Sequence, residues 1–563
     1  MRDDTLNQFS GTAHNVVQAR DIFGDVYLGQ SQMMSSVPAP RQLPADVAHF
    51  TNREQYLAEL DALLSQGGNH PSVMVVSAIA GTAGVGKTAL AVHWAHGVRN
   101  HFPDGDLYIN LRGYDPQPPV DPGQALDAFI RAFNVPAEKI PVDVSNRAAL
   151  YRTLVDRRRI LIVLDNAAAP KQVRPLLPGS PTCVVVVTSR SRLNGLTIRD
   201  GANLLTLDLL PPEQALALLV RIIRQERVDT APESARELVR LCAQLPLAIR
   251  IAGERITARP DATLAELVEE LTDERNRIEA FSDEEDDATA IRAVFSWSYK
   301  ALSPQGSRMF RLLGLHAGPE ISTMTAAVLA DTAIVRARGL MESLAKVHLI
   351  TRLKRDRYQF HDLLRAYAAE CAEQDEPDDE RERAIQRVLA WYLYSLDATD
   401  RVLAPHRSQR VPLHLPRPSQ ELLPSFSTPN DALEWCEVER ANLVAATRQA
   451  ADSQQDAVAW QLPAIMGEFL FQRRYWTEFV TTHKIGLAGA RHLDDQVGVG
   501  WMLTNLGLVH GETGQLKEAV NDCEQALIVL REIGNQLVEG IALTNLVSCN
   551  PASFTRPPGP IKS

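Results

Sequence analysis

The stretch Gly-Thr-Ala-Gly-Val-Gly-Lys-Thr at residues 81–88 decides the fold, because it fits the pattern G-x-x-x-x-G-K-[ST]. A β-branched run at 73–79 precedes it and a helical pattern at 88–98 follows it, which is the context that this pattern requires. Glycines let the backbone curl so that successive N–H groups point at one anion, and the following helix adds the positive end of its dipole. The sequence therefore predicts a loop that binds phosphate groups.

This loop predicts roles for single residues. Lys87 supplies a positive charge for the outer phosphates of a nucleotide, and the Thr88 hydroxyl is a ligand for Mg²⁺. Nucleotide contacts are expected from the loop and the residue after it, namely Gly81, Gly84, Val85, Gly86, Lys87, Thr88 and Ala89. The alternative is a structural turn that matches the pattern by chance.

Short hydrophobic runs alternate with helical patterns between residues 46 and 210. The runs lie at 73–79, 107–111, 160–164, 183–187 and 204–207. They are almost continuously hydrophobic, as strands buried on both faces are, and strand–helix alternation favours a parallel sheet covered on both sides. We therefore expect residues 46–210 to form an α/β domain of the P-loop NTPase type.

Two charged residues follow strands of this sheet at its carboxyl edge, where open α/β sheets bind ligands. Asp165 is expected to hold Mg²⁺ with Thr88, directly or through water; the alternative is a helix or turn cap. Arg190 is expected to approach a terminal phosphate, because guanidinium stays charged and binds phosphate through two N–H groups; a surface ion pair is the alternative. Asn166 follows Asp165 and cannot act as a general base, so we expect any ATP hydrolysis to be slow.

The chain beyond residue 210 is predicted to be mainly helical. Residues 211–287 read as a helical domain, and residues 288–375 combine helices with a hairpin at 349–360, which is typical of a winged helix. Six prolines within 405–429 exclude a continuous helix, so a long loop is expected inside a helical linker at 376–455.

The last part of the chain repeats itself after 40 residues. Leu-Thr-Asn-Leu at 503–506 recurs at 543–546, and internal periods of this size indicate stacked helical repeats. Residues 456–550 therefore resemble tetratricopeptide repeats; an ordinary helical hairpin is the alternative. The last copy stops before a second helix, so an exposed apolar face is expected near Leu543 and Leu546.

Composition limits the other possibilities. The 563 residues are 45% hydrophobic and 23% charged, which fits several globular domains and excludes wholesale disorder or a coiled-coil rod. A formal net charge of −11 and 6% aromatic residues disfavour generic binding to DNA phosphates or stacking on bases. We expect residues 1–45 to form a tail with a short hairpin at 15–28, and residues 551–563 to form a disordered tail.

The six cysteines and the hydrophobic runs indicate a compartment. The cysteines show neither metal-ligand spacing nor a disulfide framework, and they are expected to be reduced and buried. No signal peptide and no run long enough to span a bilayer is present in the sequence. We therefore expect a cytoplasmic protein without a membrane partner.

The P-loop, Asp165, Arg190 and the strand Leu-Tyr-Ile-Asn-Leu at 107–111 together resemble the signal-transducing NTPases with numerous domains, in particular the NB-ARC class. The resemblance covers roughly residues 46–372. This class includes apoptosome adaptors, plant disease-resistance proteins and large bacterial transcriptional regulators. The resemblance implies binding of ADP and ATP with Mg²⁺.

Three further motifs resemble those of the class. Phe-Thr-Asn-Arg-Glu, which contains Arg53, is similar to the motif beside the adenine, and Gln-Leu-Pro-Leu is similar to the motif whose proline, here Pro246, packs on the adenine. Phe-His-Asp-Leu is similar to the motif whose histidine, here His361, reaches the β-phosphate of ADP. The alternatives are that Pro246 only starts a helix and that Asp362 only caps one.

The resemblance implies a nucleotide-controlled switch. ADP would hold the α/β domain against the helical and winged-helix domains, exchange for ATP would open them, and the repeats would sense a protein partner. A nucleotide-dependent homo-oligomer stays open, and direct binding of nucleic acid is not expected. Three other functions stay open: a DNA-binding regulator that uses the winged helix, a turnover ATPase and a passive repeat scaffold. Some bacterial relatives carry a DNA-binding domain before this core, for which the 45 preceding residues are too few.

Overall fold

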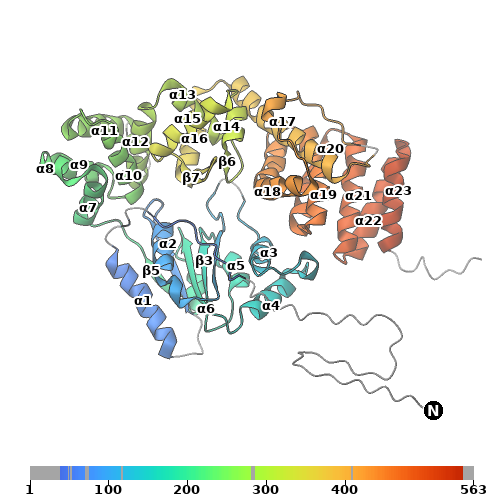
Figure 1. The fold of residues 1–563 in the computed structure, drawn as a ribbon, viewed down its shortest axis with the longest axis horizontal. Helices are drawn as coiled ribbons and strands as arrows, with labels where there is room; N and C mark the ends of the chain where they lie inside the picture. Colours follow the sequence, from blue (N-terminus) through green and yellow to red (C-terminus); the bar gives the residue numbers. More distant parts are fainter. Residues whose placement is uncertain are drawn as a thin grey trace, which may run out of the picture. The chain divides into compact units, whose positions relative to one another are not determined.

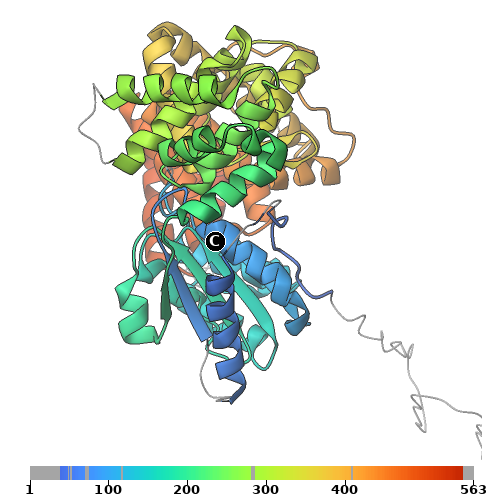
Figure 2. The same cartoon turned by 90° about the vertical axis from the view of Figure 1, so that its left-hand side faces the viewer.

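The fold is seen in a computed structural model, drawn in two views in Figures 1 and 2. It describes residues 38–47, 50, 53–69, 75–115, 118–279, 286–407 and 410–549. The hairpin expected at 15–28 and the tail expected at 551–563 lie outside these residues.

A five-stranded parallel sheet forms the first large element, with strand order β2-β3-β4-β1-β5. Its strands are β1 (Val75–Ala80), β2 (Gly105–Asn110), β3 (Ile160–Asp165), β4 (Val184–Ser189) and β5 (Asn203–Thr206). Each predicted run corresponds to one strand, so the predicted α/β fold is confirmed. Because β4 lies between β1 and β3, side chains after β1, β3 and β4 meet at one edge of the sheet.

Successive residues of the central strands enter two hydrophobic cores, as strands buried on both faces require. In β3, Leu161 and Val163 belong to one core and Ile162 and Leu164 to the other, and all four are fully buried. Burial of such a side chain stabilises the fold by about 2 kcal/mol.

Helices cover both faces of this sheet (Figure 1). The first core includes residues from α1 (Glu54–Asn69) and α2 (Lys87–Val98). The second core includes residues from α3 (Pro122–Ala132), α4 (Val144–Val155), α5 (Pro170–Val173) and α6 (Asn194–Asp200).

Short 3-10 turns are found at η1 (Arg99–His101), η2 (Ala137–Lys139), η3 (Arg174–Leu176) and η4 (Gln420–Leu422).

Helices follow the sheet, as predicted for residues 211–287. They are α7 (Pro212–Ile223), α8 (Gln225–Asp229), α9 (Pro232–Leu241), α10 (Pro246–Thr257) and α11 (Leu264–Glu279). Helix α10 approaches α7 closely, because a Cβ added at Gly253 would lie 2.8 Å from Ile222. This packing positions the start of α10, which reaches the candidate site.

The next part combines helices with a small antiparallel sheet of order β6-β8-β7. Its helices are α12 (Asp286–Lys300), α13 (Pro304–Gly314), α14 (Thr323–Leu329), α15 (Ile334–Lys346) and α16 (Asp362–Asp375), and its strands are β6 (Ile321–Ser322), β7 (Thr351–Lys354) and β8 (Arg357–Gln359). The predicted hairpin at 349–360 is confirmed. The winged-helix assignment that rests on it stays a prediction.

A long loop with the short turn η4 separates α17 (Asp378–Leu403) from α18 (Pro429–Asp452), as the proline density predicts. Stacked helices then follow (Figure 1): α19 (Asp456–Gln472), α20 (Trp476–His492), α21 (Gln496–Glu512), α22 (Leu516–Glu532) and α23 (Gln536–Cys549).

The helical repeats keep the predicted period, since α19, α21 and α23 begin at residues 456, 496 and 536. Glycine permits the close approach of α21 and α22, because a Cβ at Gly507 would lie 2.5 Å from Cys523 Sγ. At the last repeat Leu543 is 39% exposed, as expected, whereas Leu546 is partly buried against the core. Ile541 and Val547 on the same helix are also exposed, so the exposed apolar face expected near Leu543 and Leu546 is confirmed.

All six cysteines are free thiols and are buried, as predicted. Within the described part of the chain, no helix combines the length and the apolar character needed to cross a membrane.

Candidate functional site

The loop at residues 81–88 connects β1 to α2 and ends in left-handed backbone. Gly84 has φ +77° and Gly86 has φ +99°, a conformation that side chains other than glycine rarely adopt. Gly86 precedes α2, and no side chain caps the start of that helix. The first N–H groups of α2 are therefore without a side-chain acceptor, which suits an anion.

Lys87 reaches back across this loop. Its Nζ donates to the carbonyl oxygens of Gly81 at 2.8 Å and Thr82 at 2.7 Å. Burial, and then the positive charge of Arg190, lower the pKa of Lys87 to about 8. The ammonium is still mainly protonated at neutral pH, so it presents a positive charge at the mouth of the loop.

Asp165, at the end of β3, is the centre of a hydrogen-bonded group. Its Oδ1 accepts from Thr88 Oγ1 at 2.7 Å and from Thr188 Oγ1 at 2.5 Å, and its Oδ2 accepts from the Tyr108 hydroxyl at 3.0 Å. Burial, and then the carboxylate of Asp165, raise the pKa of Tyr108 well above its usual value. The structure thus brings together the two residues expected to hold Mg²⁺, Thr88 and Asp165, beside the loop.

Arg190 and Asn166 share one partner on α16. Asn166 Nδ2 donates to Asp362 Oδ2 at 3.1 Å, and Arg190 Nη2 lies 3.4 Å from the same oxygen. The guanidinium of Arg190 also lies over the ring of Tyr114, 5.0 Å from its centroid. Burial, and then Asp115, raise the pKa of Asp362. Arg190 therefore makes an ion pair, as the alternative interpretation had it, but across to a helix 172 residues further along the chain.

His361 is the N-cap of α16, where its Nδ1 accepts from the Leu363 N–H at 3.3 Å. The interpretation of Asp362 as the cap was wrong, because Asp362 is the first helical residue and its carboxylate turns to Arg190 and Asn166. Surrounding protein atoms, and then the cations Arg190 and Lys87, lower the pKa of His361 to about 4, although its side chain is exposed. The imidazole is therefore neutral at physiological pH.

Pro246 is the first residue of α10, so it does start a helix, and it also faces the loop. A Cβ at Gly86 would lie 3.9 Å from Pro246 Cγ, and the Leu247 N–H donates to the Gly84 carbonyl oxygen at 3.4 Å. The helical part after the sheet thus contacts the phosphate-binding loop directly.

Arg53 is buried beside the same loop. Its guanidinium donates to the Asp208 carbonyl oxygen at 2.8 Å and to the Val85 carbonyl oxygen at 3.2 Å, and burial lowers its pKa. The side chain of Val85 is fully buried, so Val85 presents only backbone to the loop's mouth, whereas Ala89 is partly exposed in the first turn of α2.

Three residues of the site were not singled out from the sequence. Tyr108 and Thr188 hold Asp165, and Asp362 holds Arg190 and Asn166. Tyr108 lies within a predicted strand and Thr188 directly follows one, so their place at the carboxyl edge was available as a signal. The pairing of Asp362 with Arg190 and Asn166 gave no signal in the sequence, because it depends on how α16 packs against the sheet.

A glycine-rich loop after the β1 strand of a parallel sheet, with a carboxylate at the end of β3 beside the loop threonine, defines a P-loop NTPase. No protein-family model matches the chain. The chain is 39% identical over 504 residues, 89% of its length, to 50% of the regulatory protein AfsR of Streptomyces griseus. It is 40% identical over 443 residues, 77% of its length, to 44% of the same protein of Streptomyces coelicolor.

A fungal nucleotide-binding leucine-rich repeat (NLR)-like protein of Hyaloscypha variabilis is 25% identical over 226 residues, 36% of this chain and 22% of its own. A solved STAND protein with a tetratricopeptide repeat sensor from Pyrococcus horikoshii is 18% identical, covering 90% of this chain and 81% of its own with a TM-score of 0.43.

The chain is therefore a relative of the AfsR regulatory proteins, and the predicted resemblance to signal-transducing NTPases of the NB-ARC class with tetratricopeptide-like repeats is confirmed. It spans about half the length of these curated relatives.

Proposed function

We propose that this chain is an adenine-nucleotide switch within a regulatory protein. The observation that carries the proposal is the convergence of Lys87, Arg190 and His361, from three separate elements, at the mouth of the loop. The positive charge of Arg190 lowers the pKa of Lys87, and the charges of Arg190 and Lys87 contribute to lowering the pKa of His361, whose imidazole is neutral. A cluster of this kind gains stability from a bound anion such as a nucleotide phosphate.

The residues beside the loop fit a magnesium ion. Thr88 and Asp165 offer a hydroxyl and a carboxylate oxygen, which are ligands that Mg²⁺ prefers, and their oxygens are 2.7 Å apart. Among the described residues no cluster of three or more His, Cys, Asp or Glu side chains could hold a metal. Thr88 and Asp165 would therefore hold the ion together with nucleotide oxygens and water, and the bound ion would neutralise phosphate charge.

Two contacts make the closed state depend on the ligand. Pro246 on α10 faces the loop, and His361 at the start of α16 lies near enough to Lys87 and Arg190 for their charges to contribute to lowering its pKa. We expect both residues to contact ADP, Pro246 at the adenine and His361 at the β-phosphate, as the family resemblance implies. Each contact joins the sheet to a helix from a later part of the chain, so bound ADP strengthens the closed arrangement.

Arg190 supplies the switching step. It is paired with the Asp362 carboxylate in the closed arrangement. A γ-phosphate near Arg190 competes with Asp362 for the guanidinium and repels that carboxylate, which weakens the hold of α16 on the sheet. A ligand shifts the equilibrium between closed and open arrangements only by the difference in its affinity for the two. A change in their populations from 1:99 to 99:1 requires a difference of about 5.5 kcal/mol.

Hydrolysis of ATP is proposed to be slow and to serve the switch. Asp165 and Arg190 are the proposed catalytic residues, through Mg²⁺ and through phosphate charge. Asn166 follows Asp165, cannot take a proton from water, and donates to Asp362. This favours a switch over the alternative of a turnover ATPase.

The helical repeats are proposed to bind a protein partner in the cytoplasm, because stacked helix pairs present an extended surface for proteins. The regulatory character of the AfsR relatives supports an output in regulation. Nucleotide-dependent self-association and direct DNA binding by the small sheet and its helices remain open alternatives, and sedimentation with each nucleotide and a salt-dependent gel shift test them.

Calorimetric titration with ADP and Mg²⁺ tests the proposal. We expect Lys87→Ala to weaken ADP binding by at least about tenfold, because it removes the charge that faces the phosphates. Lys171→Ala is the matched control, since Lys171 is an exposed lysine on α5, on the other face of the sheet. Equal ADP affinity of the two variants, or no ADP binding by the wild-type chain after removal of any co-purified nucleotide, would falsify the proposal.

A further inference from the structure

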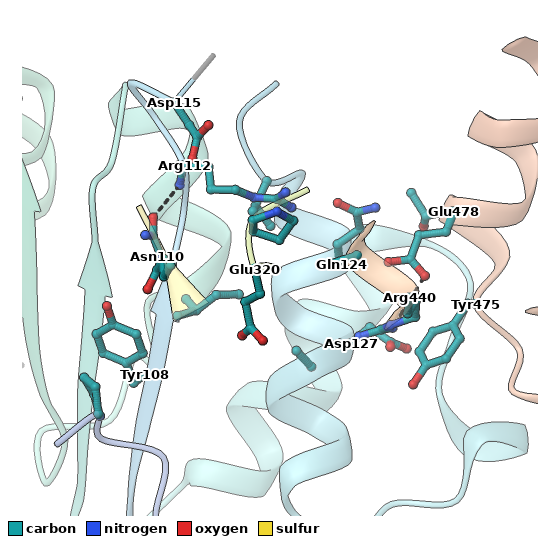
Figure 3. A pocket seen from close by; sticks show the side chains of 18 of the residues that line it. Tyr108, Asn110, Arg112, Asp115, Gln124, Asp127, Glu320, Arg440, Tyr475 and Glu478 are labelled. Carbon is teal, nitrogen blue, oxygen red and sulfur yellow. Dashed lines mark hydrogen bonds and ion pairs between the residues drawn. The ribbon is translucent and has the colours of Figure 1, made fainter. Parts of the chain in front are cut away.

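A tyrosine of the repeats is held between two arginines from different parts of the chain. Tyr475, which precedes α20, is buried. The guanidinium carbon of Arg440 on α18 lies 3.8 Å from the centroid of its ring, and that of Arg131 on α3 lies 4.3 Å from it. Both distances lie within the range of cation–π attraction. Figure 3 shows the Arg440 guanidinium beside the Tyr475 ring.

Arg131 makes hydrogen bonds both within α3 and to the end of α19. Its Nε donates to Asp127 Oδ2 one turn earlier on α3, at 2.6 Å, and its Nη2 donates to the Arg473 carbonyl oxygen at 2.9 Å. Arg473 is the C-cap of α19, where carbonyl groups carry the negative end of the helix dipole. A guanidinium at this position is therefore favourable, and it connects the NTPase part of the chain to the turn between α19 and α20.

This contact borders a cavity of about 400 Å³ (Figure 3). Its lining includes Gln124 and Asp127 of α3, Glu320 beside the small sheet, Glu478 of α20 and Tyr108 of β2. Both charged and apolar side chains, among the latter Val120, Leu353 and Trp476, therefore line the space between α3 and the repeats. A polar contact beside an open volume can separate at lower cost than a packed core.

The cavity also leads to the candidate site. Tyr108 lines it, and the hydroxyl of Tyr108 donates to Asp165 Oδ2 at 3.0 Å. A movement of the repeats away from α3 therefore changes the surroundings of a residue that holds the proposed magnesium ligand.

We propose that the α3 face formed by Asp127 and Arg131 is an intramolecular docking surface for the turn 473–475 of the repeats. We call the contact between Arg131 and Tyr475 the clasp. The clasp holds the repeats to the NTPase part in the ADP-bound state, and a protein partner that binds the turn competes with α3 and opens it. This inference rests on the proposed switch and adds the residues through which the repeats act on it.

Release of a fluorescent ADP analogue, with small-angle X-ray scattering of the full chain, tests the clasp. Arg131→Ala removes the contact between the two parts together with the ion pair to Asp127 within α3. We expect about tenfold faster ADP release and an expanded scattering profile with ADP bound. Arg440→Ala removes the stacking partner on α18 but leaves Arg131 against Tyr475, and Tyr475→Phe keeps the ring while removing its hydrogen bond to Glu437. Both are expected to stay closer to wild type than Arg131→Ala does.

Arg131→Gln is the second variant, and thermal melting verifies that each variant is folded. Wild-type release rate and scattering in folded Arg131→Ala and Arg131→Gln would overturn the clasp. A wild-type profile that differs between ADP and an ATP analogue, with no effect of either variant, would overturn the clasp alone. A wild-type profile that never responds to nucleotide, with both variants expanded, would overturn the switch and leave the clasp as a fixed docking contact.

Discussion

At the scale of single residues, the site gathers the side chains of Lys87, Arg190 and His361 at the start of α2. Arg190 lowers the pKa of Lys87, Arg190 and Lys87 contribute to lowering the pKa of His361, and Asp362 pairs with Arg190. We expect a bound phosphate group to accept hydrogen bonds from Lys87, Arg190 and His361. This arrangement explains why the N-terminus of α2 carries no side-chain cap: the first N–H groups face the same place.

His361 gives a prediction for pH dependence. Its pKa is about 4 in the nucleotide-free chain, so the imidazole is neutral at pH 7. A bound phosphate favours the protonated form and raises the pKa of His361, so ADP binding takes up protons. ADP affinity therefore gains as the pH falls from about 7 toward the pKa of the free chain, and the gain ends below it.

His361→Gln keeps a hydrogen-bonding side chain that does not titrate. We expect its ADP affinity, followed by calorimetry between about pH 8 and about pH 5, to fall behind that of wild type by up to about tenfold at the acidic end. The titration of ADP itself affects both proteins equally, so it cancels in the ratio of their ADP affinities. A ratio that stays constant with pH would show that His361 does not face the phosphates.

Among the residues of the site, sequence reasoning succeeded where a residue's place follows from its own strand. The loop 81–88 and Asp165 lie where their strands end, and Thr188, which directly follows the hydrophobic run 183–187, could have been found in the same way. Sequence reasoning offered only a helix cap as the alternative role of Asp362 and missed its pairing with Arg190, because that pairing joins residues 172 positions apart.

At the scale of elements, hydrophobic patterning and the 40-residue repeat predicted the strands and the repeat helices. The five hydrophobic runs became strands because each is short, nearly continuous and β-branched, and the 40-residue offset fixed the starts of α19, α21 and α23. The relative placement of α3 and the α19–α20 turn was not predictable, since no periodic pattern encodes the meeting of Arg131 with Tyr475.

Glycines of the repeats give a prediction at this scale. At Gly507 an added Cβ would lie 2.5 Å from Cys523 Sγ, which is buried between α21 and α22. Gly507→Ala is therefore expected to reduce the free energy of unfolding by about 1–3 kcal/mol through overpacking. Gly540 on α23 is the matched control, since no atom lies within 4 Å of a Cβ there.

Gly540→Ala is expected to stabilise α23 by up to about 1 kcal/mol, because alanine favours helices over glycine. Urea unfolding followed by circular dichroism measures both variants. If Gly507→Ala unfolds at the same urea concentration as Gly540→Ala, the close packing of α21 on α22 is wrong.

At the scale of the whole molecule, three contacts connect the NTPase part of the chain to later elements. Pro246 faces the loop from α10, Asp362 pairs with Arg190 from α16, and Tyr475 stacks on Arg131 beside α20. The first two surround the proposed phosphate site and the third borders the cavity that reaches Tyr108. In the proposed switch, nucleotide and repeats would therefore act on the same closed arrangement from two sides.

Distance measurement between two spin labels tests this central claim most directly. All six native cysteines are buried, so labels attach to cysteines introduced at Ile198 on α6, 86% exposed, and Val335 on α15, 74% exposed. We predict one distance distribution with saturating ADP and a longer one with a non-hydrolysable ATP analogue, and loss of the difference in Lys87→Ala. Superimposable distributions with the two saturating nucleotides in the otherwise wild-type chain would contradict the account.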